Sequence, residues 1–81
     1  MVNNIFGERL REIRKRREFT QKELGSKCGA CAGAIRDWEK GLRLPNTYYL
    51  REICVALNVS ADYLLGLRKG KPKTKGKQVR I

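Results

Sequence analysis

Residues typical of helix ends divide the stretch from Thr20 to Gly41 into two short helices, and this pattern constrains the fold more than any other. Thr20 is followed three residues later by Glu23, which is the capping-box pattern at the start of a helix. Gly29 suits the left-handed backbone conformation that follows a helix C-terminus. A second helical pattern occupies residues 32–40 and ends at Gly41. The sequence therefore predicts two short helices joined by a short turn.

The residues between these boundaries suit two helices that cross at close range. Gly25 provides the small residue that a close crossing requires. Apolar side chains occupy the positions that would fill the angle between the helices: Leu24, Cys28, Ala30, Ile35 and Trp38. Two helices joined through a glycine-containing turn form a helix-turn-helix unit. We therefore predict such a unit over residues 21–40, with Trp38 in the core.

The rest of the sequence up to residue 67 also follows a helical period. Apolar residues recur three or four positions apart at Phe6, Leu10 and Ile13, and again at Leu50, Ile53, Cys54 and Leu57. Candidate caps precede these helices and a short last one: Asn3 or Asn4, Asn46 or Thr47, and Ser60. No segment alternates as a strand does. We predict an all-α domain of five helices over residues 1–67.

The basic charge is unevenly distributed along the chain. Its 81 residues include 19 Lys and Arg against 8 Asp and Glu, a formal net charge of +11 that points to a polyanionic partner. Residues 68–81 hold seven of the basic residues and no acid, alternating with Gly, Pro and Thr, so we expect a disordered basic tail. Two interpretations are open: a well-solvated chain with an adhesive tail, or a basic face joined to a basic arm.

The three cysteines and the absence of histidine argue against an enzyme, a metal site or a cofactor. Cys28 and Cys31 form a CxxC pair, but zinc requires four ligands and Cys54 is the only other cysteine. No βαβ pattern surrounds the pair, as it would in a thioredoxin-like oxidoreductase. We interpret Cys28 and Cys54 as core residues and Cys31 as a weak cap of the third helix. A thiol-sensing role is the alternative.

The sequence gives no sign of a membrane or secretory segment. No apolar stretch approaches the roughly 18 residues that a membrane-spanning helix needs. No apolar run at the N-terminus precedes a cleavage site. We therefore expect a cytoplasmic protein.

Three strings carry a resemblance to a known family: ERLREIRKRREFTQKEL at 8–24, IRDWEKG at 35–41 and ALNVSADYLLG at 56–66. In order and spacing they resemble the DNA-binding domain of phage repressors and Cro-like proteins, the XRE family. The resemblance implies a lambda-repressor-like domain whose third helix lies in the major groove of double-stranded DNA. It implies phosphate contacts at Thr20, Gln21, Lys22, Lys40, Arg43, Asn46 and Tyr48. The alternative for Tyr48 is that it and Tyr49 both pack over the core.

The start of the third helix departs from the family pattern. Positions that read bases in relatives usually carry Gln, Arg, Ser or Thr, and here they are Ala32, Gly33 and Ala34. Alanine can contact a thymine methyl group, whereas glycine has no side chain to read with. We assign candidate base contacts to Ala32, Gly33, Arg36 and Asp37. Arg36 can read a guanine or hold a phosphate; Asp37 can accept from cytosine, orient Arg36 or be a surface charge.

The resemblance implies three further features. Arg14 and Glu39 match positions that form a partly buried ion pair in some relatives, the alternative being two unrelated surface charges. Glu18 stands where relatives commonly have a glycine that ends the first helix. The candidates for a dimer interface, with Tyr63 facing outward, are Leu57, Val59 and Tyr63; the alternative is a monomer with scattered exposed apolar residues.

The leading hypothesis is a sequence-specific transcriptional regulator, more often a repressor in this family. It would bind a pseudo-palindromic operator as a homodimer, with half-sites about 34 Å apart. The alternative is a protein-interaction module, such as an antitoxin whose partner is a toxin. An oxidoreductase built on the CxxC pair is a third class, which the lack of histidine and the small size disfavour.

Overall fold

The structure, a computed structural model, describes residues 4–67 and contains five α-helices in that range. They are α1 (Ile5–Arg16), α2 (Gln21–Cys28), α3 (Ala32–Lys40), α4 (Thr47–Leu57) and α5 (Ala61–Leu65). Residues 4–67 contain no strand, and the predicted all-α fold class is confirmed. Asn3, a candidate cap, and the basic tail expected at residues 68–81 lie outside the described residues.

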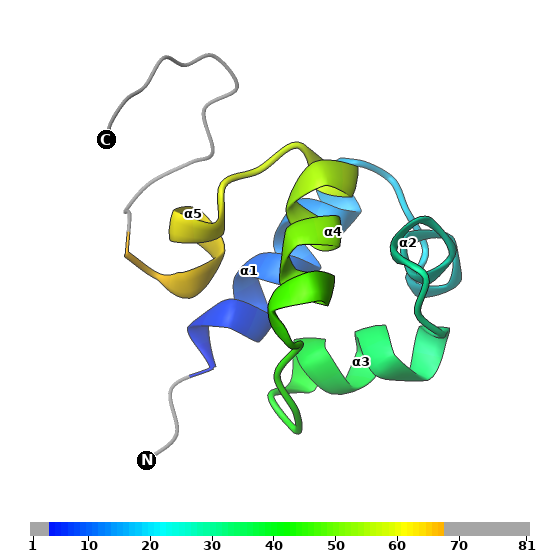
Figure 1. Cartoon of the computed structure of the whole chain (residues 1–81), viewed down its shortest axis with the longest axis horizontal. Helices are drawn as coiled ribbons and strands as arrows, with labels where there is room; N and C mark the ends of the chain where they lie inside the picture. Colours follow the sequence, from blue (N-terminus) through cyan, green and yellow to red (C-terminus); the bar gives the residue numbers. More distant parts are fainter. Residues whose placement is uncertain (1–3, 68–81) are drawn as a thin grey trace.

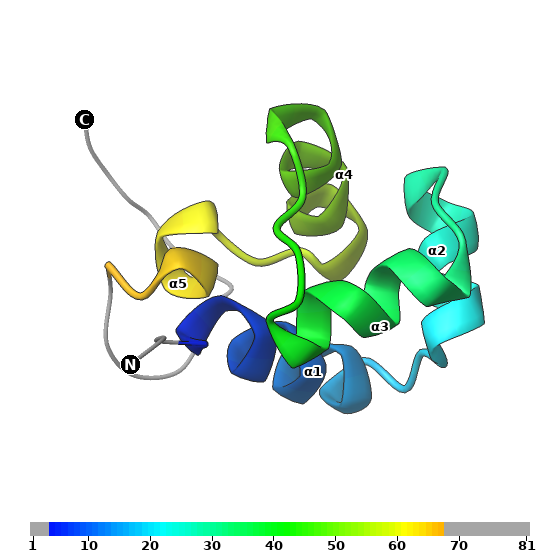
Figure 2. The ribbon, with the colours of Figure 1, turned by 90° about the horizontal axis from the view of Figure 1, so that it is seen from below.

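The helices surround one core. α2 packs against α3 and α4, while α1 packs against α3 and α5 (Figure 1). The view turned by 90° shows α1 running beside α3 (Figure 2). The core between the five helices contains fully buried side chains: Leu10, Ile13, Leu24, Ile35, Ile53, Leu57 and Leu64. This packing leaves α3 at the edge of the domain, with Ile35 and Trp38 buried and Arg36 exposed.

Hydrogen bonds confirm the predicted boundaries of the α2–α3 unit. Thr20 Oγ1 accepts from the amide of Glu23 at 3.0 Å, and Glu23 Oε1 accepts from the amide of Thr20 at 2.9 Å. Gly29 has a φ of 80°, which glycine adopts without strain. A Cβ at Gly25 would lie 2.7 Å from the carbonyl oxygen of Ala30, so no larger residue fits this crossing. The angle between α2 and α3 is therefore set by these few positions.

The caps of the other helices follow the sequence in two cases and depart from it in one. Asn46 Oδ1 accepts from the amide of Tyr49 at 2.9 Å, and Ser60 Oγ accepts from the amide of Tyr63 at 3.1 Å. Asn4 occupies the capping position of α1, but its side chain makes no capping hydrogen bond. Asn4 is thus one of the two predicted capping residues, but its side chain is directed to α3 and does not bond the first turn of α1.

The connection between α1 and α2 depends on Glu18. α1 ends at Arg16, and Glu18 adopts a φ of 63° in the left-handed region. Its amide donates to the carbonyl oxygen of Lys15 at 2.9 Å. The position therefore has the geometry that glycine adopts most readily, although a glutamate occupies it.

The structure places the three predicted dimer-interface residues in the core. Leu57, Val59 and Tyr63 are 0%, 8% and 5% exposed. The expectation that Tyr63 faces outward was wrong, because α5 packs back against α1 and the Tyr63 ring lies under the guanidinium of Arg9, 4.6 Å from its centroid. These side chains offer little surface to a second copy of the chain, so the interface predicted from them is not available.

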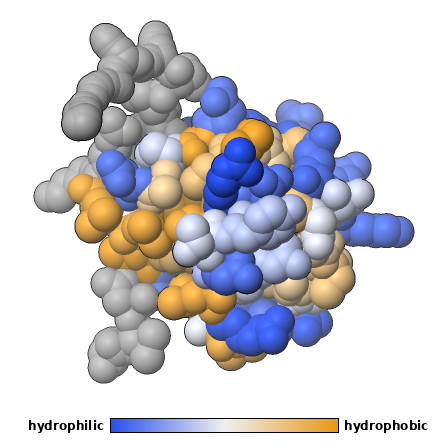
Figure 3. Space-filling model, in the orientation of Figure 1, coloured by the Kyte–Doolittle hydropathy of each residue, from blue (hydrophilic) through white to orange (hydrophobic). Residues whose placement is uncertain are grey.

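The large apolar side chains that are exposed lie elsewhere: Leu42, Leu44, Tyr48, Val55, Leu65 and Leu67. Figure 3 shows apolar surface gathered on the side of the domain that carries α5. Among residues 4–67, no helix has both the length and the apolar character that crossing a membrane requires.

Candidate nucleic-acid interface

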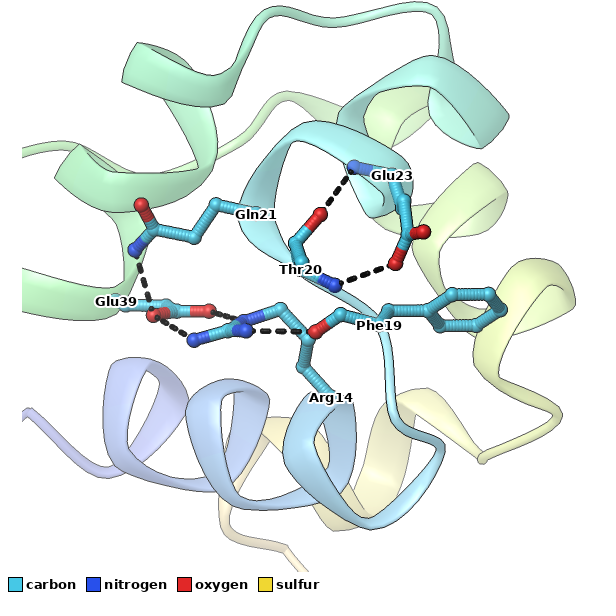
Figure 4. Close-up of polar contacts among 6 residues, drawn as sticks. All are labelled: Arg14, Phe19, Thr20, Gln21, Glu23 and Glu39. Atoms are coloured by element: carbon cyan, nitrogen blue, oxygen red, sulfur yellow. Dashed lines mark hydrogen bonds and ion pairs between the residues drawn. The ribbon is translucent and has the colours of Figure 1, made fainter.

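A buried polar network fixes the end of α3 against α1 and α2 (Figure 4). Arg14 of α1 donates through Nε to Glu39 Oε2 and through Nη2 to Glu39 Oε1, the latter at 3.2 Å. Gln21 of α2 donates to the same Oε1 at 3.1 Å, and Arg14 Nη1 donates to the carbonyl oxygen of Phe19 at 2.7 Å. The predicted Arg14–Glu39 ion pair is confirmed. It holds the two helices of the unit in one orientation.

A second contact holds the same end of α3 through its backbone. Asn4 Nδ2 donates to the carbonyl oxygen of Glu39 at 3.2 Å. The last carbonyl groups of a helix have no partner within the helix. The Asn4 side chain therefore supplies a hydrogen bond that α3 itself lacks. The sequence carries no local signal for this contact, because Glu39 is 35 residues away.

The start of α2 presents free backbone amides beside a basic side chain. The Thr20–Glu23 capping box satisfies one amide of the first turn. Lys22 is exposed, as a phosphate contact requires. The side chain of Gln21 is held by Glu39, so its amide nitrogen is directed into the domain. The start of α2 can therefore receive a phosphate through backbone amides and Lys22, but the Gln21 side chain is already engaged.

The start of α3 is built from small side chains. Cys31 occupies the capping position and makes no side-chain capping hydrogen bond, as the sequence predicts for a weak cap. Ala32, Gly33 and Ala34 follow, all half-buried. A Cβ at Gly33 would find only Cys31 Sγ nearby, at 3.8 Å, so nothing in the domain requires a glycine there. This end of α3 presents a smooth surface with little hydrogen-bonding capacity beyond the backbone.

Two arginines converge on one aspartate farther along α3. Arg36 Nη2 donates to Asp37 Oδ1 at 3.4 Å, and Arg43 Nε lies 3.6 Å from Asp37 Oδ2. Both arginine side chains are more than half exposed, whereas the Asp37 side chain is 23% exposed. The structure thus brings together two candidate base contacts and one candidate phosphate contact in a single charged group.

The end of α3, the loop that follows it and the first turn of α4 carry the remaining candidate phosphate contacts. Lys40, Arg43, Asn46 and Tyr48 are all exposed. Asn46 uses its Oδ1 to cap α4, which leaves its amide nitrogen for an outside acceptor. The Tyr48 ring packs edge-on against Tyr49, with centroids 5.2 Å apart, and Tyr49 packs against Trp38 at 5.5 Å. Tyr49 is therefore the cover over the core, and Tyr48 is free to meet a ligand.

The cysteines differ in exposure. Cys28, at the end of α2, is buried in the core, as predicted. Cys54 is half-buried and packs against the same core. Burial, with smaller contributions from Glu52 and Cys54, raises the pKa of the Cys28 thiol from 9.0 to about 11. Burial also raises the pKa of Cys54. Cys31 is exposed at the start of α3. No group of three His, Cys, Asp or Glu side chains within residues 4–67 is arranged to hold a metal ion.

Three arginines are engaged within the domain. Arg9 Nη1 donates to the carbonyl oxygen of Tyr63 at 2.7 Å. Arg17 Nε donates to the carbonyl oxygen of Leu57 at 2.8 Å. Arg14 belongs to the network described above. These guanidinium groups meet the carboxyl ends of other helices, so only part of the positive charge is free for an outside partner.

Comparison with known proteins agrees with this geometry. A helix-turn-helix family model matches residues 10–64. The repressor c2 of Salmonella phage P22, solved with a synthetic operator, is 38% identical, with a TM-score of 0.73 over 74% of this chain and 91% of that chain. The N-terminal DNA binding domain of SinR from Bacillus subtilis is 26% identical, with a TM-score of 0.72 over 78% of this chain and 93% of that chain.

A full-length relative shows how far the likeness extends. The transcriptional regulator ImmR of Bacillus subtilis is 38% identical over 60 residues, which cover 74% of this chain. The chain spans only 47% of the length of ImmR, so the likeness is confined to one part of that protein. The shared helices, the family match and the identity to phage repressors agree. The chain therefore belongs to the XRE, or phage-repressor, family of helix-turn-helix proteins.

Proposed function

We propose that this chain is a DNA-binding transcriptional regulator that places α3 in the major groove of double-stranded DNA. The observation that carries the proposal is the position of α3. Ile35 and Trp38 hold one face in the core, the Glu39 network fixes its end, and Arg36 remains exposed on the opposite face. A rigid helix with an exposed cationic face matches the way such units dock. The P22 c2 repressor bound to an operator and SinR bound to DNA support this reading.

Phosphate contacts are assigned to the two ends of the unit. At one end they are the first amides of α2, Thr20 and Lys22; at the other they are Lys40, Arg43, the amide nitrogen of Asn46, and Tyr48. Contacts to phosphate fix the position of the protein on the duplex but carry no sequence information. Gln21 takes part through its backbone amide, because its side chain is held by Glu39.

Base readout rests mainly on Arg36. Ala32 can meet a thymine methyl group, and Gly33 permits close approach of the helix without reading a base. A good bidentate contact between arginine and guanine contributes about 1–3 kcal/mol of discrimination. With one such residue on α3, we expect a short, guanine-containing half-site and a modest preference over random DNA.

We further propose that two copies bind a palindromic operator and repress by covering a promoter. The buried residues Leu57, Val59 and Tyr63 cannot join them. We therefore assign the contact to two exposed apolar residues, Leu65 at the end of α5 and Leu67 just after it. Sedimentation of the Leu67→Asp variant tests this assignment. The variant is expected to remain folded and become monomeric, whereas Leu42→Asp, which changes another exposed leucine, is expected to leave association unchanged.

Selection of bound duplexes from a random DNA pool at near-physiological salt tests the proposed function. Enrichment of a palindrome with half-sites about one helical turn apart is the expected result. Binding without enrichment would leave only the sequence-independent phosphate contribution. No enrichment together with weak binding would contradict the proposal and favour a protein-interaction role such as that of an antitoxin.

A further inference from the structure

Asp37 joins the readout helix to the loop that follows it. Its two carboxylate oxygens have different partners: Oδ1 accepts from Arg36 on α3, and Oδ2 lies beside Arg43 in the loop. Its backbone carbonyl also accepts from the amide of Leu42 at 2.9 Å. One residue thus anchors the backbone just before Arg43 and contacts the Arg43 side chain.

We propose that Asp37 is a positioning residue for DNA recognition: it directs Arg36 toward the bases and links it to Arg43 at the phosphates. The inference rests on the proposed function and replaces the assignment of Asp37 as a base contact. It assigns Asp37 a role in sequence discrimination, with a small weakening of sequence-independent binding.

The chemistry of the two arginines supports this role. A guanidinium has five N–H donors, so the contact of Arg36 with Asp37 through Nη2 leaves the other donors for a guanine edge. An arginine without such a contact binds any phosphate within reach, because phosphate contacts carry no sequence information. A carboxylate beside Arg36 repels phosphate oxygens and disfavours that alternative. Holding Arg43 in the same group couples the phosphate contact to the orientation of the base contact.

The position of Asp37 argues against a direct base contact. Each oxygen of the Asp37 carboxylate already faces one arginine, so a cytosine amino group would have to share an oxygen with a guanidinium. Its side chain is also less exposed than either arginine, so the guanidinium groups extend farther from the domain. Surface ion pairs of this kind contribute little to folding stability. A substitution at Asp37 can therefore change recognition without changing the fold.

The chain offers a closely matched control. Arg51 and Glu52 on α4 are also adjacent, are also paired, at 2.7 Å, and Glu52 is 24% exposed against 23% for Asp37. Asp37→Asn and Glu52→Gln each remove one negative charge from an Arg–acid pair while keeping the size of the side chain. The probes are two duplexes: the sequence selected by the unmodified protein from a random pool, and a scrambled duplex of the same composition.

We expect Asp37→Asn to bind the scrambled duplex about threefold more tightly, because a carboxylate near the phosphates is gone. The ratio of affinities for the selected and scrambled duplexes is expected to fall about tenfold. A repeated selection with this variant is expected to lose the guanine preference at the one position of the half-site that Arg36 reads, and to keep the rest of the site. Glu52→Gln is expected to leave both the ratio and the selected site unchanged.

Other outcomes separate the two proposals. If both affinities rise by the same factor and the selected site is unchanged, Asp37 is only a surface charge and this inference is overturned. If Asp37→Asn loses binding to the selected duplex as completely as Arg36→Ala while keeping its thermal midpoint, Asp37 contacts a base and the inference is again overturned. If the unmodified protein selects no sequence, the proposed function fails and this inference fails with it.

Discussion

Glu18 is the residue whose backbone conformation least suits its side chain. Its φ of 63° places it in the left-handed region. Within residues 4–67, the only other non-glycine residue with a positive φ is Asn58. Left-handed geometry costs most L-residues about 1–2 kcal/mol, and asparagine tolerates it better than glutamate. The connection between α1 and α2 therefore contains local strain that the surrounding helices maintain.

Replacing Glu18 with glycine is expected to stabilise the domain. Glu18→Gly should raise the free energy of unfolding by about 0.5–1 kcal/mol, the relief of strain being partly offset by the greater freedom of glycine in the unfolded chain. Urea denaturation measures the change. Glu18→Gln removes the same charge and keeps the strain, so a gain of equal size in that variant would show that charge and not backbone geometry is responsible.

The Cys28 thiol makes the stability of the domain depend on pH in the alkaline range. Its pKa is raised to about 11 in the folded protein from 9.0. The folded state holds the thiol proton more tightly than the unfolded chain, so this contribution is complete below pH 9 and is lost as the pH rises toward 11. Between pH 8 and pH 10 the free energy of unfolding should fall about 1 kcal/mol more than in Cys28→Ala. Equal losses in the two proteins would contradict this prediction.

At the scale of the helices, α1 and Arg17, the residue that directly follows it, supply donors to the ends of three others. Arg9, Arg14 and Arg17 reach the last turns of α5, α3 and α4 respectively. The carboxyl end of a helix carries unpaired carbonyl groups and partial negative charge, which favour a cation there. α1 thereby fixes the orientation of α3, the helix on which the proposed function depends.

Removing Glu39 is expected to be costly because it leaves the buried Arg14 without its partner. Glu39→Ala should lower the free energy of unfolding by about 3 kcal/mol or more. Glu12→Ala breaks the exposed Glu12–Arg16 pair and should change it by no more than about 0.5 kcal/mol. Replacing Arg14 and Glu39 together with methionine should recover part of the loss, since no buried charge then lacks a partner. Equal effects of the two single variants would contradict a special role for the network.

The sequence was sufficient for the helix boundaries, because capping boxes and left-handed C-terminal residues act within a few positions. Thr20, Gly29, Asn46 and Ser60 all behave as their types predict. The contacts of Asn4 and Arg17 were not predictable, because their partners lie 35 and 40 residues away and depend on how the helices pack. Tyr63 was misplaced for the same reason: its exposure is set by the return of α5 onto α1.

At the scale of the whole molecule, the net charge overstates what is available to DNA. Several arginines of α1, and Arg17 just after it, are engaged with helix ends or with Glu12. The exposed cations beside α3 are few: Lys22, Arg36, Lys40 and Arg43. Residues 68–81 add seven basic residues to these. The balance between the two sets determines how strongly binding depends on salt.

A chain that ends at Leu67 is expected to bind with weaker salt dependence. Each phosphate that a cation neutralises contributes about 0.9 to the slope of log affinity against log salt concentration. If the tail contacts DNA, its removal should lower the magnitude of that slope by about 1 or more while leaving the selected sequence unchanged. Fluorescence anisotropy at several salt concentrations measures the slope. An unchanged slope would show that the tail does not touch the DNA.

The central claim is that the exposed face of α3 is the surface that meets DNA. Titration of the isotope-labelled protein with the selected duplex, followed through backbone amide chemical shifts, tests it most directly. We expect the largest changes at residues 20–22, 32–37 and 40–46. Small changes along α3, with the largest ones confined to α4 or to the outer face of α1 near Arg11, would contradict it.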